Sequence, residues 1–382
     1  MENFTFYNPT TIEFGAGKEQ TIGLHLAARG IKKVLLCYGS DRIKRDGLFA
    51  TVSQRLAEHS IEFVELGGIV SNPLISKVRE GVALARAEKV EAVLAIGGGS
   101  VLDSVKGIAA GVHCAGDVWD LFTNKAAVTA ALPIFAIMTL AATGSEMNCS
   151  GVVTNDDTKE KFFIAAPSLF PKVSIVNPHL MQSVTRDYLV YSAADVIAHC
   201  IETYFTAAVH PGLQSRIVES VIGTIIETTG ILLQDPENDA ARGEFAWAAT
   251  LALNGLTFSG CSGFSFPNHA IEHSLSALFN VPHGAGLSTV IPAWMKWYHG
   301  RNPGQFTRFA RQVFRVDAPE AGIAALEAWF NKIGTPTRLG QLGIKESDLP
   351  AIGDNVQMSM RRFGLAEQYT PAVVSEILRH AL

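Results

Sequence analysis

Short apolar runs alternate with longer segments of helical periodicity throughout the first half of the chain. Apolar runs of about four to eight residues bounded by Gly or Pro are typical of buried strands, and apolar residues that recur at helical spacing indicate amphipathic helices. This pattern predicts strands over residues 32–39, 61–66, 91–99 and 133–139 and helices over residues 47–60, 75–90 and 100–112. Strands that alternate with helices form parallel sheets, whose ligands bind at the carboxyl ends of the strands.

The pattern changes at Asn177 and Pro178, beyond which helical periodicity dominates and strand signals are few. The longest helical segments cover residues 184–207, 212–234, 241–257 and 371–382. We therefore predict an α/β domain with a parallel sheet over residues 1–177 and an all-helical domain over residues 178–382.

Composition and charge narrow the classes of partner. The chain has 382 residues, of which 31 are basic and 36 acidic, and no basic tract stands out, so neither nucleic acid nor a membrane is expected as a partner. The N-terminal sequence lacks the basic and apolar regions of a signal peptide, and the five scattered cysteines without CxxC spacing indicate free thiols. We therefore expect a cytoplasmic protein.

The uncharged stretches 126–145 and 245–268 contain Pro or several Gly, Ser and Asn. This composition favours buried elements that lead into loops, rather than membrane spans.

Three consecutive glycines interrupt the sequence "VLAIGGGSVLDSVKGIAAG", at the point where a predicted strand ends and a predicted helix begins. Because Gly97, Gly98 and Gly99 lack Cβ atoms, backbone N–H groups there can approach an anion, and the helix N-terminus adds partial positive charge. Ser100 can cap that helix or donate to a phosphate oxygen. A pyrophosphate fits this loop, and a tight strand–helix turn without a ligand is the alternative. The loop matches neither GxGxxG nor a Walker motif.

A second polar loop, "TLAATGSE", follows the next predicted strand. Thr139, Thr143 and Ser145 offer hydroxyl groups there beside Gly144. A polar loop with a helix cap is the alternative reading. Because the carboxyl ends of parallel strands share one edge of the sheet, the two loops together favour a dinucleotide site.

Histidine and aspartate side chains at helical spacing indicate a metal site in the second half. Asp195 and His199 lie four residues apart in a predicted helix, which places both on one face. His269, His273 and His283 lie within one short stretch, and the first two are again four residues apart. Neutral imidazole and carboxylate suit Zn²⁺ and Fe²⁺. Hydrogen-bonded core or surface histidines remain the alternative.

Several motifs stand in one order along the chain: "FYNPTTIEFGAG", "NPLISKV", "AIGGGSVLDSVKGIA", "TLAATGSE", "PSLFPKVSIVNP", "ADVIAHCIETY" and "HAIEHSLSALFNVPHGAGLS". Through them the chain resembles the iron-containing (group III) alcohol dehydrogenases over nearly its whole length. The resemblance is strongest to the branch of butanol dehydrogenases and broad-specificity NADPH-dependent aldehyde reductases. It implies a dehydroquinate synthase-like architecture, with an N-terminal dinucleotide-binding domain, a C-terminal metal-binding and substrate domain, and a homodimer.

The resemblance also implies roles for individual residues. Asp195, His199, His269 and His283 would bind one divalent metal ion, Fe²⁺ or Zn²⁺, and His273 would be a catalytic residue near the nicotinamide and the substrate. The implied coenzyme contacts are Gly39, Ser40, Asn72, Gly97, Gly98, Gly99, Ser100, Asp103, Thr139, Leu140, Thr143, Ser145 and Lys161.

The resemblance implies a metal-dependent alcohol dehydrogenase or aldehyde reductase that transfers hydride between NAD(P)H and a small aldehyde or primary alcohol. Glycerol dehydrogenase and dehydroquinate synthase-like enzymes share the fold, but they typically use three protein ligands. A metal-dependent hydrolase is the alternative of another class, and the paired nucleotide loops argue against it. The stretch 260–268 departs from the family pattern beside the implied substrate pocket and leaves the substrate open.

The turn after the first predicted parallel strand, "CYGSDRIKRDG", bears on the choice of coenzyme. In relatives that use NAD, a carboxylate in this turn binds the adenosine ribose and repels a 2′-phosphate. Ser40 stands at that position here, and Arg42, Lys44 and Arg45 follow and could pair with a phosphate. This pattern favours NADP(H) over NAD(H). If the alignment slipped by one residue, Asp41 would occupy the position and the expectation would reverse.

Overall fold

The computed structural model describes residues 1–382 and divides into two compact units. The α/β unit comprises Tyr7–Thr158 and Phe162–Val184. The helical unit comprises Met1–Phe6, Lys159–Lys161 and Thr185–Leu382. The chain therefore passes between the units more than once. The assignment of coenzyme binding to one unit and metal binding to the other remains a prediction.

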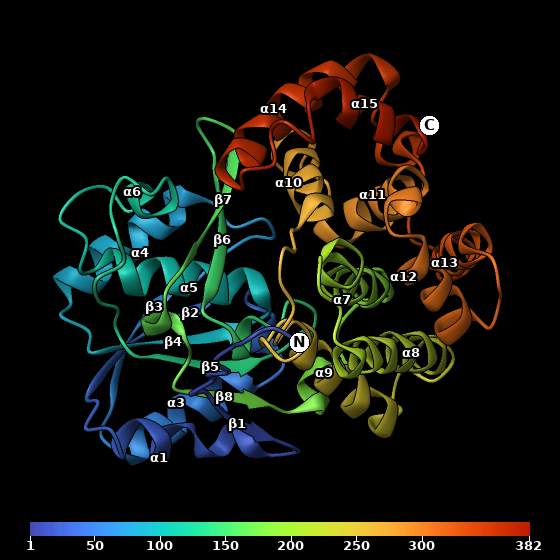
Figure 1. The fold of residues 1–382 in the computed structure, drawn as a ribbon. Coiled ribbons are helices and arrows are strands. Elements are labelled where there is room, and N and C mark those ends of the chain that lie inside the picture. Colours follow the sequence, from blue (N-terminus) through green and yellow to red (C-terminus); the bar gives the residue numbers. More distant parts are fainter. The chain divides into compact units, whose positions relative to one another are not determined.

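A six-stranded sheet forms the centre of the α/β unit (Figure 1). Its strands lie in the order β1-β8-β5-β4-β2-β3, and every neighbouring pair is parallel. The strands are β1 (Thr11–Phe14), β2 (Lys33–Tyr38), β3 (Glu62–Leu66), β4 (Ala92–Gly97), β5 (Ile134–Met138) and β8 (Val173–Val176).

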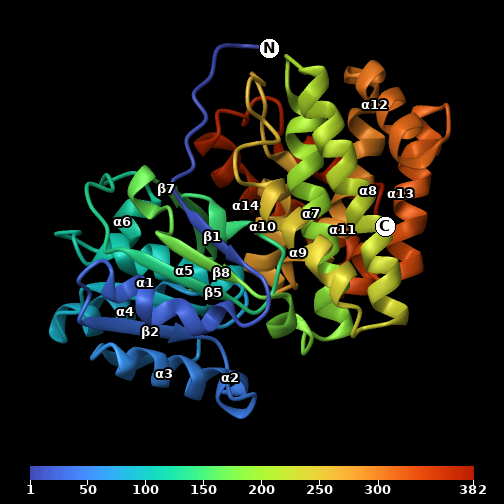
Figure 2. The ribbon, with the colours of Figure 1, turned by 90° about the horizontal axis from the view of Figure 1, so that it is seen from below.

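Helices cover both faces of this sheet, which explains why its central strands are apolar on both sides. Figure 1 shows α1 (Ile22–Ala27) and α3 (Leu48–Glu58) on one face and α4 (Ile75–Ala87) and α5 (Gly99–Gly111) on the other. On the first face, Leu26 of α1 packs in one buried cluster with side chains of β2, β4, β5 and β8. The short helices α2 (Arg42–Arg45) and α6 (Trp119–Phe122) complete the unit, and Figure 2 shows α2 beside α3.

The order of the strands reverses direction between β2 and β4. From β2 the chain crosses to β3 on one side, and β4 then pairs with β2 on the other side. Open α/β sheets bind ligands outside the carboxyl ends of the strands at such a reversal. The backbone after Tyr38 and the backbone after Gly97 lie at this point, so the glycine loop predicted to bind pyrophosphate stands where the topology favours a ligand.

Two further strands, β6 (Ser150–Asn155) and β7 (Glu160–Ala165), form a separate two-stranded sheet. The residues at the start of β7, Lys159–Lys161, belong to the helical unit, where Asn355 Nδ2 donates to the Lys159 carbonyl oxygen at 3.1 Å. The hairpin thus supplies Lys161 to the helical unit.

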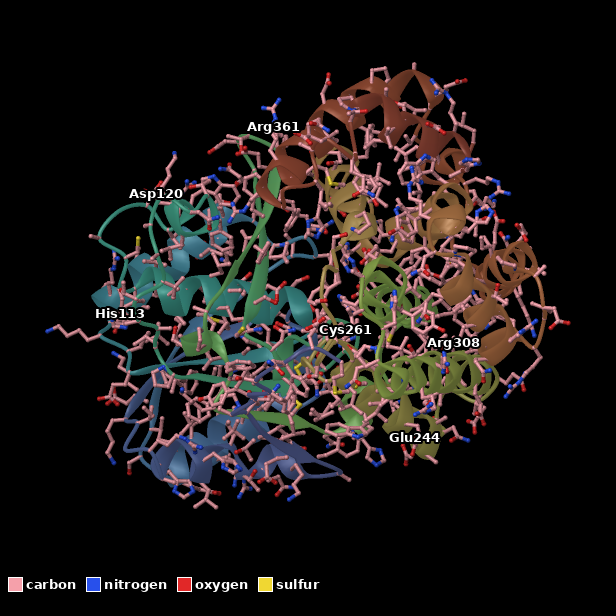
Figure 3. The ribbon with its side chains drawn as sticks, viewed as in Figure 1. His113, Asp120, Glu244, Cys261, Arg308 and Arg361 are labelled. Carbon is pink, nitrogen blue, oxygen red and sulfur yellow. The ribbon has the colours of Figure 1, made fainter.

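The helical unit surrounds one buried helix, α7, whose neighbours include α8, α9, α10 and α11 (Figure 1). Its helices are α7 (Arg186–Thr206), α8 (Gly212–Gln234), α9 (Asp239–Ala252), α10 (Pro267–Phe279), α11 (His283–Tyr298), α12 (Pro303–Phe309), α13 (Pro319–Ile333), α14 (Leu349–Arg362) and α15 (Pro371–Arg379). Thr185 caps α7 by accepting from the Tyr188 N–H. Figure 3 marks Arg308 of α12, which forms an ion pair with Glu219 of α8. By length and hydropathy alone α8 could cross a membrane, a criterion that core helices of globular proteins also meet.

Candidate active site

Three helices of the helical unit bring the predicted metal ligands together. Asp195 and His199 lie one turn apart on α7, His269 lies in the first turn of α10, and His283 is the first residue of α11. Pro282 precedes α11 as its N-cap, which fixes the chain direction at His283. All four side chains are thus placed by helices or helix ends.

One carboxylate oxygen is the common centre of this cluster. The distances from Asp195 Oδ1 to the Nε2 atoms are 3.5 Å for His199, 3.7 Å for His269 and 3.6 Å for His283. These separations exceed good hydrogen-bond lengths. They resemble the edge of a tetrahedron of ligands around one metal ion, which is about 3.4 Å when the metal–ligand bonds are about 2.1 Å.

Buried polar atoms without partners support the same assignment. Asp195 Oδ1 and His269 Nε2 are both buried and have no hydrogen-bond partner. Native structures rarely leave such atoms unsatisfied, and a cation between them would satisfy both. One carboxylate and three imidazoles are donors that suit Zn²⁺ or Fe²⁺. The residues present therefore fit a divalent metal ion.

A second carboxylate, Glu202 of α7, holds His269 in position. Its Oε1 accepts from the His269 backbone N–H at 2.8 Å and lies 3.0 Å from His269 Nδ1. Its Oε2 accepts from Asn268 Nδ2 at 3.1 Å. Because Nδ1 is engaged by this carboxylate, Nε2 is left to face Asp195, an arrangement common behind metal-binding histidines.

A third carboxylate, Glu272 of α10, holds His283 in the same way. His283 Nδ1 and the Ser276 hydroxyl both contact the Glu272 carboxylate. Lys161 Nζ lies 3.8 Å from Glu272 Oε2. A Cβ atom on Gly286 would come within 2.7 Å of the Glu272 side chain, so glycine at that position provides the space that this carboxylate occupies.

The pKa shifts of Asp195 and His199 favour the ionisation states that bind a metal ion. Burial would raise the pKa of Asp195, but His199, His269 and His283 outweigh it and lower that pKa. Burial lowers the pKa of His199 to about 3, against the opposing effect of Asp195. Burial would also lower the pKa of His269, but the nearby carboxylates of Asp195 and Glu202 raise it to about 9. The lowered pKa values of Asp195 and His199 favour a carboxylate and a neutral imidazole, which are the forms that bind a divalent ion.

His273 lies beside the metal cluster and outside the shared contact with Asp195. Its ring centre is 5.7 Å from that of His283 and 6.3 Å from that of His269. Burial, together with the charge of Lys161, lowers the pKa of His273 well below its ordinary value. The Lys161 backbone takes part in a hydrogen bond with His273. The predicted catalytic histidine is therefore close to the ligands, buried and neutral.

The glycine loop in the α/β unit has a partly different explanation from the one that the sequence suggested. A Cβ atom on Gly97 would lie 2.4 Å from Val101, and one on Gly99 would lie 2.4 Å from Thr143. Protein side chains therefore already require glycine at these two positions. At Gly98 the nearest atoms to an added Cβ would belong to Leu140, the first of them at 3.1 Å.

Ser100 does not cap α5, contrary to one of its two expected roles. The N-cap residue is Gly98, and no side chain accepts a hydrogen bond from the first turn. Glycine in this position leaves the first N–H groups of α5 to other partners. The other expected role of Ser100, donation to a phosphate oxygen, remains a prediction.

The second polar loop is tied to the glycine loop within the α/β unit. The Thr139 N–H donates to the Gly97 carbonyl oxygen at 3.0 Å. The Ser145 hydroxyl donates to Asp103 Oδ1 at 2.8 Å, and the Val152 N–H donates to Asp103 Oδ2 at 3.1 Å. Asp103 and Ser145 therefore join the two loops, and their contact with a coenzyme is a proposal.

Lys106 of α5 completes this connection, although the sequence analysis assigned it no role. Its fully buried ammonium contacts four oxygen atoms of residues 145–150: the carbonyl and hydroxyl of Ser145, Asn148 Oδ1 and the carbonyl of Ser150, at 2.7 to 2.9 Å. Burial lowers its pKa to about 8, with Asp103 opposing. Lys106 therefore fixes the shape of the second loop.

The turn after β2 holds fewer unpaired cations than the sequence suggested. Ser40 is exposed, and Lys44 donates to Glu65 Oε2 at 2.7 Å. Arg42 donates to the Ser183 carbonyl oxygen at 3.1 Å. Arg45 is exposed.

The other predicted coenzyme contacts lie in the α/β unit, apart from Lys161. Gly39 follows β2, and a Cβ atom there would come within 3.1 Å of the Ile69 carbonyl oxygen. Asn72 is buried and has a positive φ of 52°. Leu140 is half-buried against Gly98.

Sequence reasoning missed Glu202, Glu272 and Lys106. A signal for the first two was present, because Glu202 lies three residues after His199 and Glu272 lies between His269 and His273. Acidic residues in otherwise uncharged, buried helices are rare unless they are paired. Their placement beside predicted ligands indicates that they belong to the site, but Glu202 contacts His269 and Glu272 contacts His283, each on the next helix of the cluster.

Comparison with known proteins gives matches across nearly the whole chain. The profile "Iron-containing alcohol dehydrogenase" matches residues 9–178, and the profile "Fe-containing alcohol dehydrogenase family, C-terminal" matches residues 189–382. Probable NADH-dependent butanol dehydrogenase 1 of Bacillus subtilis is 38% identical and aligns over 100% of both chains. NADPH-dependent aldehyde reductase YqhD of Escherichia coli is 31% identical over 92% of both chains. The solved structure of NADH-dependent butanol dehydrogenase A from Thermotoga maritima is 43% identical, with a TM-score of 0.96 over 100% of this chain and 99% of that one.

Proposed function

The chain belongs to the iron-containing alcohol dehydrogenase family, and on that premise we propose that it is a metal-dependent alcohol dehydrogenase that interconverts small aldehydes and primary alcohols with NAD(P)H. One observation carries the proposal: three imidazole Nε2 atoms lie 3.5 to 3.7 Å from a single buried carboxylate oxygen of Asp195. The similarity to named butanol dehydrogenases and an aldehyde reductase supports the reaction class.

The protein's own contribution is to hold and orient the reacting groups. Asp195, His199, His269 and His283 would hold a divalent cation that would supply Lewis-acid polarisation of the substrate oxygen, and the reduced nicotinamide would supply the hydride. Glu202 and Glu272 fix the rings of His269 and His283, so that both Nε2 atoms point to the common centre. The buried surroundings exclude water from this centre.

We assign the proton partner of the substrate oxygen to His273. It is the imidazole beside the ligand cluster that does not share the contact with Asp195. Its hydrogen bond to the Lys161 backbone fixes one ring nitrogen. The second nitrogen is thereby free to exchange a proton with the substrate oxygen.

The coenzyme site is assigned to the carboxyl ends of β2, β4 and β5. Gly98 and the N-terminus of α5 would receive the pyrophosphate, and Thr139, Leu140 and Thr143 of the second loop would line the nicotinamide side. Lys161 would reach the coenzyme from the helical unit, as the resemblance implies. Location in the cytoplasm and assembly as a homodimer belong to the same proposal, and the five unpaired cysteines fit a reducing compartment.

Within NAD(P)H we propose NADP(H) as the preferred coenzyme. Ser40 is exposed and neutral, so a 2′-phosphate would meet no carboxylate at that position, and Arg45, five residues later at the end of α2, is also exposed. Lys44 is engaged by Glu65 and adds less than the sequence suggested. The relative with 38% identity is named NADH-dependent, and the relative with 31% identity is named NADPH-dependent. The ratio of kcat/KM for NADPH to kcat/KM for NADH tests this preference. A ratio below one would reject NADP(H) and assign the ribose contact to Asp41.

One experiment tests the enzyme assignment as a whole. Metal content of the purified protein is measured together with NADPH and NADH oxidation in the presence of butanal. His269→Ala should lose both the bound metal and turnover, whereas His380→Ala, at an exposed histidine near the C-terminus, should retain both. Full activity of His269→Ala after chelator treatment would refute the site. A protein that binds metal and no coenzyme would instead be a hydrolase candidate.

A further inference from the structure

Glu272 makes more contacts with functional groups than a carboxylate that only orients one histidine needs. Its side chain is completely buried and contacts His283 Nδ1, the Ser276 hydroxyl and, at 3.8 Å, Lys161 Nζ. The contacts with His283 and Lys161 involve the same oxygen, Oε2, and Oε1 accepts from Ser276. One carboxylate oxygen therefore faces an imidazole and an ammonium group at once.

All of these residues are fixed within the helical unit. Glu272 and Ser276 are one turn apart on α10, His283 begins α11, and Lys161 belongs to the segment Lys159–Lys161. The hydrogen bond between His273 and the Lys161 backbone anchors that segment independently of the ion pair. Gly286 leaves the space for the Glu272 carboxylate. The arrangement is thus built by several elements and does not depend on a flexible side chain alone.

We propose that Glu272 is a positioning residue shared between His283 and Lys161, through which the charge of Lys161 sets how strongly His283 binds the metal. The inference rests on the metal site of the proposed function. A carboxylate that accepts from Nδ1 raises the electron density at Nε2 and strengthens the imidazole as a ligand. An ammonium group beside the same oxygen reduces the electron density that the carboxylate adds at Nε2. Lys161 therefore weakens metal binding through Glu272, and any ligand that draws Lys161 away strengthens it.

A double-mutant cycle with Zn²⁺ as the probe tests this inference. The dissociation constant for Zn²⁺ is measured by competition with a chromogenic chelator, without any assay of turnover. Glu272→Gln should weaken Zn²⁺ binding by about tenfold or more, in the range seen for such partners. Lys161→Met should tighten Zn²⁺ binding by about threefold or more, and this gain should be lost in the Glu272→Gln background. Equal gains in both backgrounds would show that Lys161 acts on the metal directly and would overturn the proposal.

Glu202 provides the matched control, because it orients His269 and its contacts do not include Lys161. Glu202→Gln should also weaken Zn²⁺ binding, but Lys161→Met should then tighten it as much as in the unmodified protein. Loss of the gain in this background too would contradict a specific role for Glu272.

A second pair of variants avoids any change at Glu272, in case Glu272→Gln does not fold. Lys161→Arg retains the charge and should keep the affinity for Zn²⁺ within about twofold, whereas Lys161→Met should tighten it. Equal affinities for these two variants would overturn the proposal. If all the expected differences in Zn²⁺ affinity were found in a protein that does not reduce aldehydes, the proposed function would be refuted and this inference would stand.

Discussion

Adjacent glycines in the loop after β4 lack side chains for different reasons. Gly97 and Gly99 are required by Val101 and Thr143, which would lie 2.4 Å from an added Cβ atom. Gly98 has no such neighbour, since Leu140 would lie at 3.1 Å and can shift. Gly98 is therefore the residue whose missing side chain is most directly explained by a ligand.

We expect Gly98→Ala to raise the dissociation constant of the preferred coenzyme at least about tenfold, which corresponds to about 1.4 kcal/mol. The added methyl group would occupy space that the pyrophosphate needs. Metal content should not change. Fluorescence titration with NADPH measures the affinity, and Gly107→Ala is the control on the same helix, because its Cβ atom would have similar nearest contacts, at 3.1 and 3.3 Å. If both variants bind coenzyme like the unmodified protein, the loop is only a tight turn.

The four metal ligands could be predicted from sequence, whereas the histidine that each carboxylate behind them contacts could not. His269 and His283 stand out because histidine is scarce and its spacing follows the helix period. Glu202 and Glu272 are common residue types, and their roles depend on which ring nitrogen each faces in the folded protein. That contact joins different helices in each case, and a periodic pattern within one helix carries no information about it.

At the level of elements, the sequence predicted the strands from β5 to the β3 edge of the sheet and missed the two strands at the opposite edge. The expected strands correspond to β2, β3, β4 and β5, whereas β1, β8 and the hairpin of β6 and β7 were not predicted. β1 and β8 have four residues each, and Thr11 pairs with Val173 from the far end of the unit. Strands this short show little hydrophobic pattern of their own. Each is stabilised by pairing with a strand that is distant in the sequence.

The ion pairs of Glu327 connect α13 to α11, the helix that begins with the predicted ligand His283. Glu327 Oε2 lies 2.8 Å from Lys296 Nζ, and Arg338 also donates to Glu327. Burial would raise the pKa of Glu327, but the hydrogen bonds from Lys296 and Arg338 outweigh it and lower the pKa. A lowered carboxyl pKa contributes stability above the unfolded value, and this contribution is lost as the pH falls through the folded value.

We expect Glu327→Gln to reduce the free energy of unfolding by about 1 kcal/mol at pH 7, since both partners are partly exposed. The difference should shrink progressively below about pH 4, where the carboxyl group becomes protonated. Denaturant unfolding at several pH values measures it. Glu320→Gln, at an exposed glutamate of the same helix, should change stability by less than about 0.5 kcal/mol. A difference that persists unchanged at pH 3 would mean that the charge of Glu327 is not responsible.

The loop between α9 and α10, in which Figure 3 marks Cys261, carries aromatic rings toward the metal cluster. The ring of Phe266 lies 5.8 Å from that of His269, and Phe264 lies 6.3 Å from Phe266. The N-terminal segment supports the loop, since the Glu2 N–H donates to the Gly260 carbonyl oxygen at 2.9 Å. An apolar wall beside a ligand favours substrates with apolar chains.

We therefore expect butanal to be preferred over acetaldehyde, by about 0.8 kcal/mol for each of its additional methylene groups that is buried. Phe266→Ala should lower the ratio of kcat/KM for butanal over acetaldehyde several-fold, with metal content unchanged. Phe258→Ala removes a ring farther along the same chain of contacts, 5.4 Å from Phe264, and should leave the ratio nearly unaltered. An unchanged ratio in Phe266→Ala would place the substrate chain elsewhere.

At the scale of the whole molecule, the two predicted sites draw on different units. Asp195 and the three histidines predicted to bind metal all belong to the helical unit, and the glycine loop belongs to the α/β unit. Lys161, from the hairpin, is the predicted coenzyme contact that belongs to the helical unit. Metal binding and coenzyme binding should therefore be separable in measurement, although turnover needs both.

Removal of the metal should show this separation most directly. In the apo form, the buried carboxylate of Asp195 is faced only by the imidazoles of His199, His269 and His283, so the helical unit loses a large electrostatic stabilisation when the metal is removed. A metal present at about a thousand times its dissociation constant contributes about 4 kcal/mol to folding. Dialysis against a chelator should abolish turnover and lower the unfolding temperature, and added Zn²⁺ or Fe²⁺ should restore both. The dissociation constant of the coenzyme, measured by fluorescence, should change less than about tenfold, or about 1.4 kcal/mol, because most of its predicted contacts lie in the other unit. A larger loss of coenzyme binding would mean that the metal site itself holds the coenzyme. The assignment of metal binding and coenzyme binding to separate units would then be wrong.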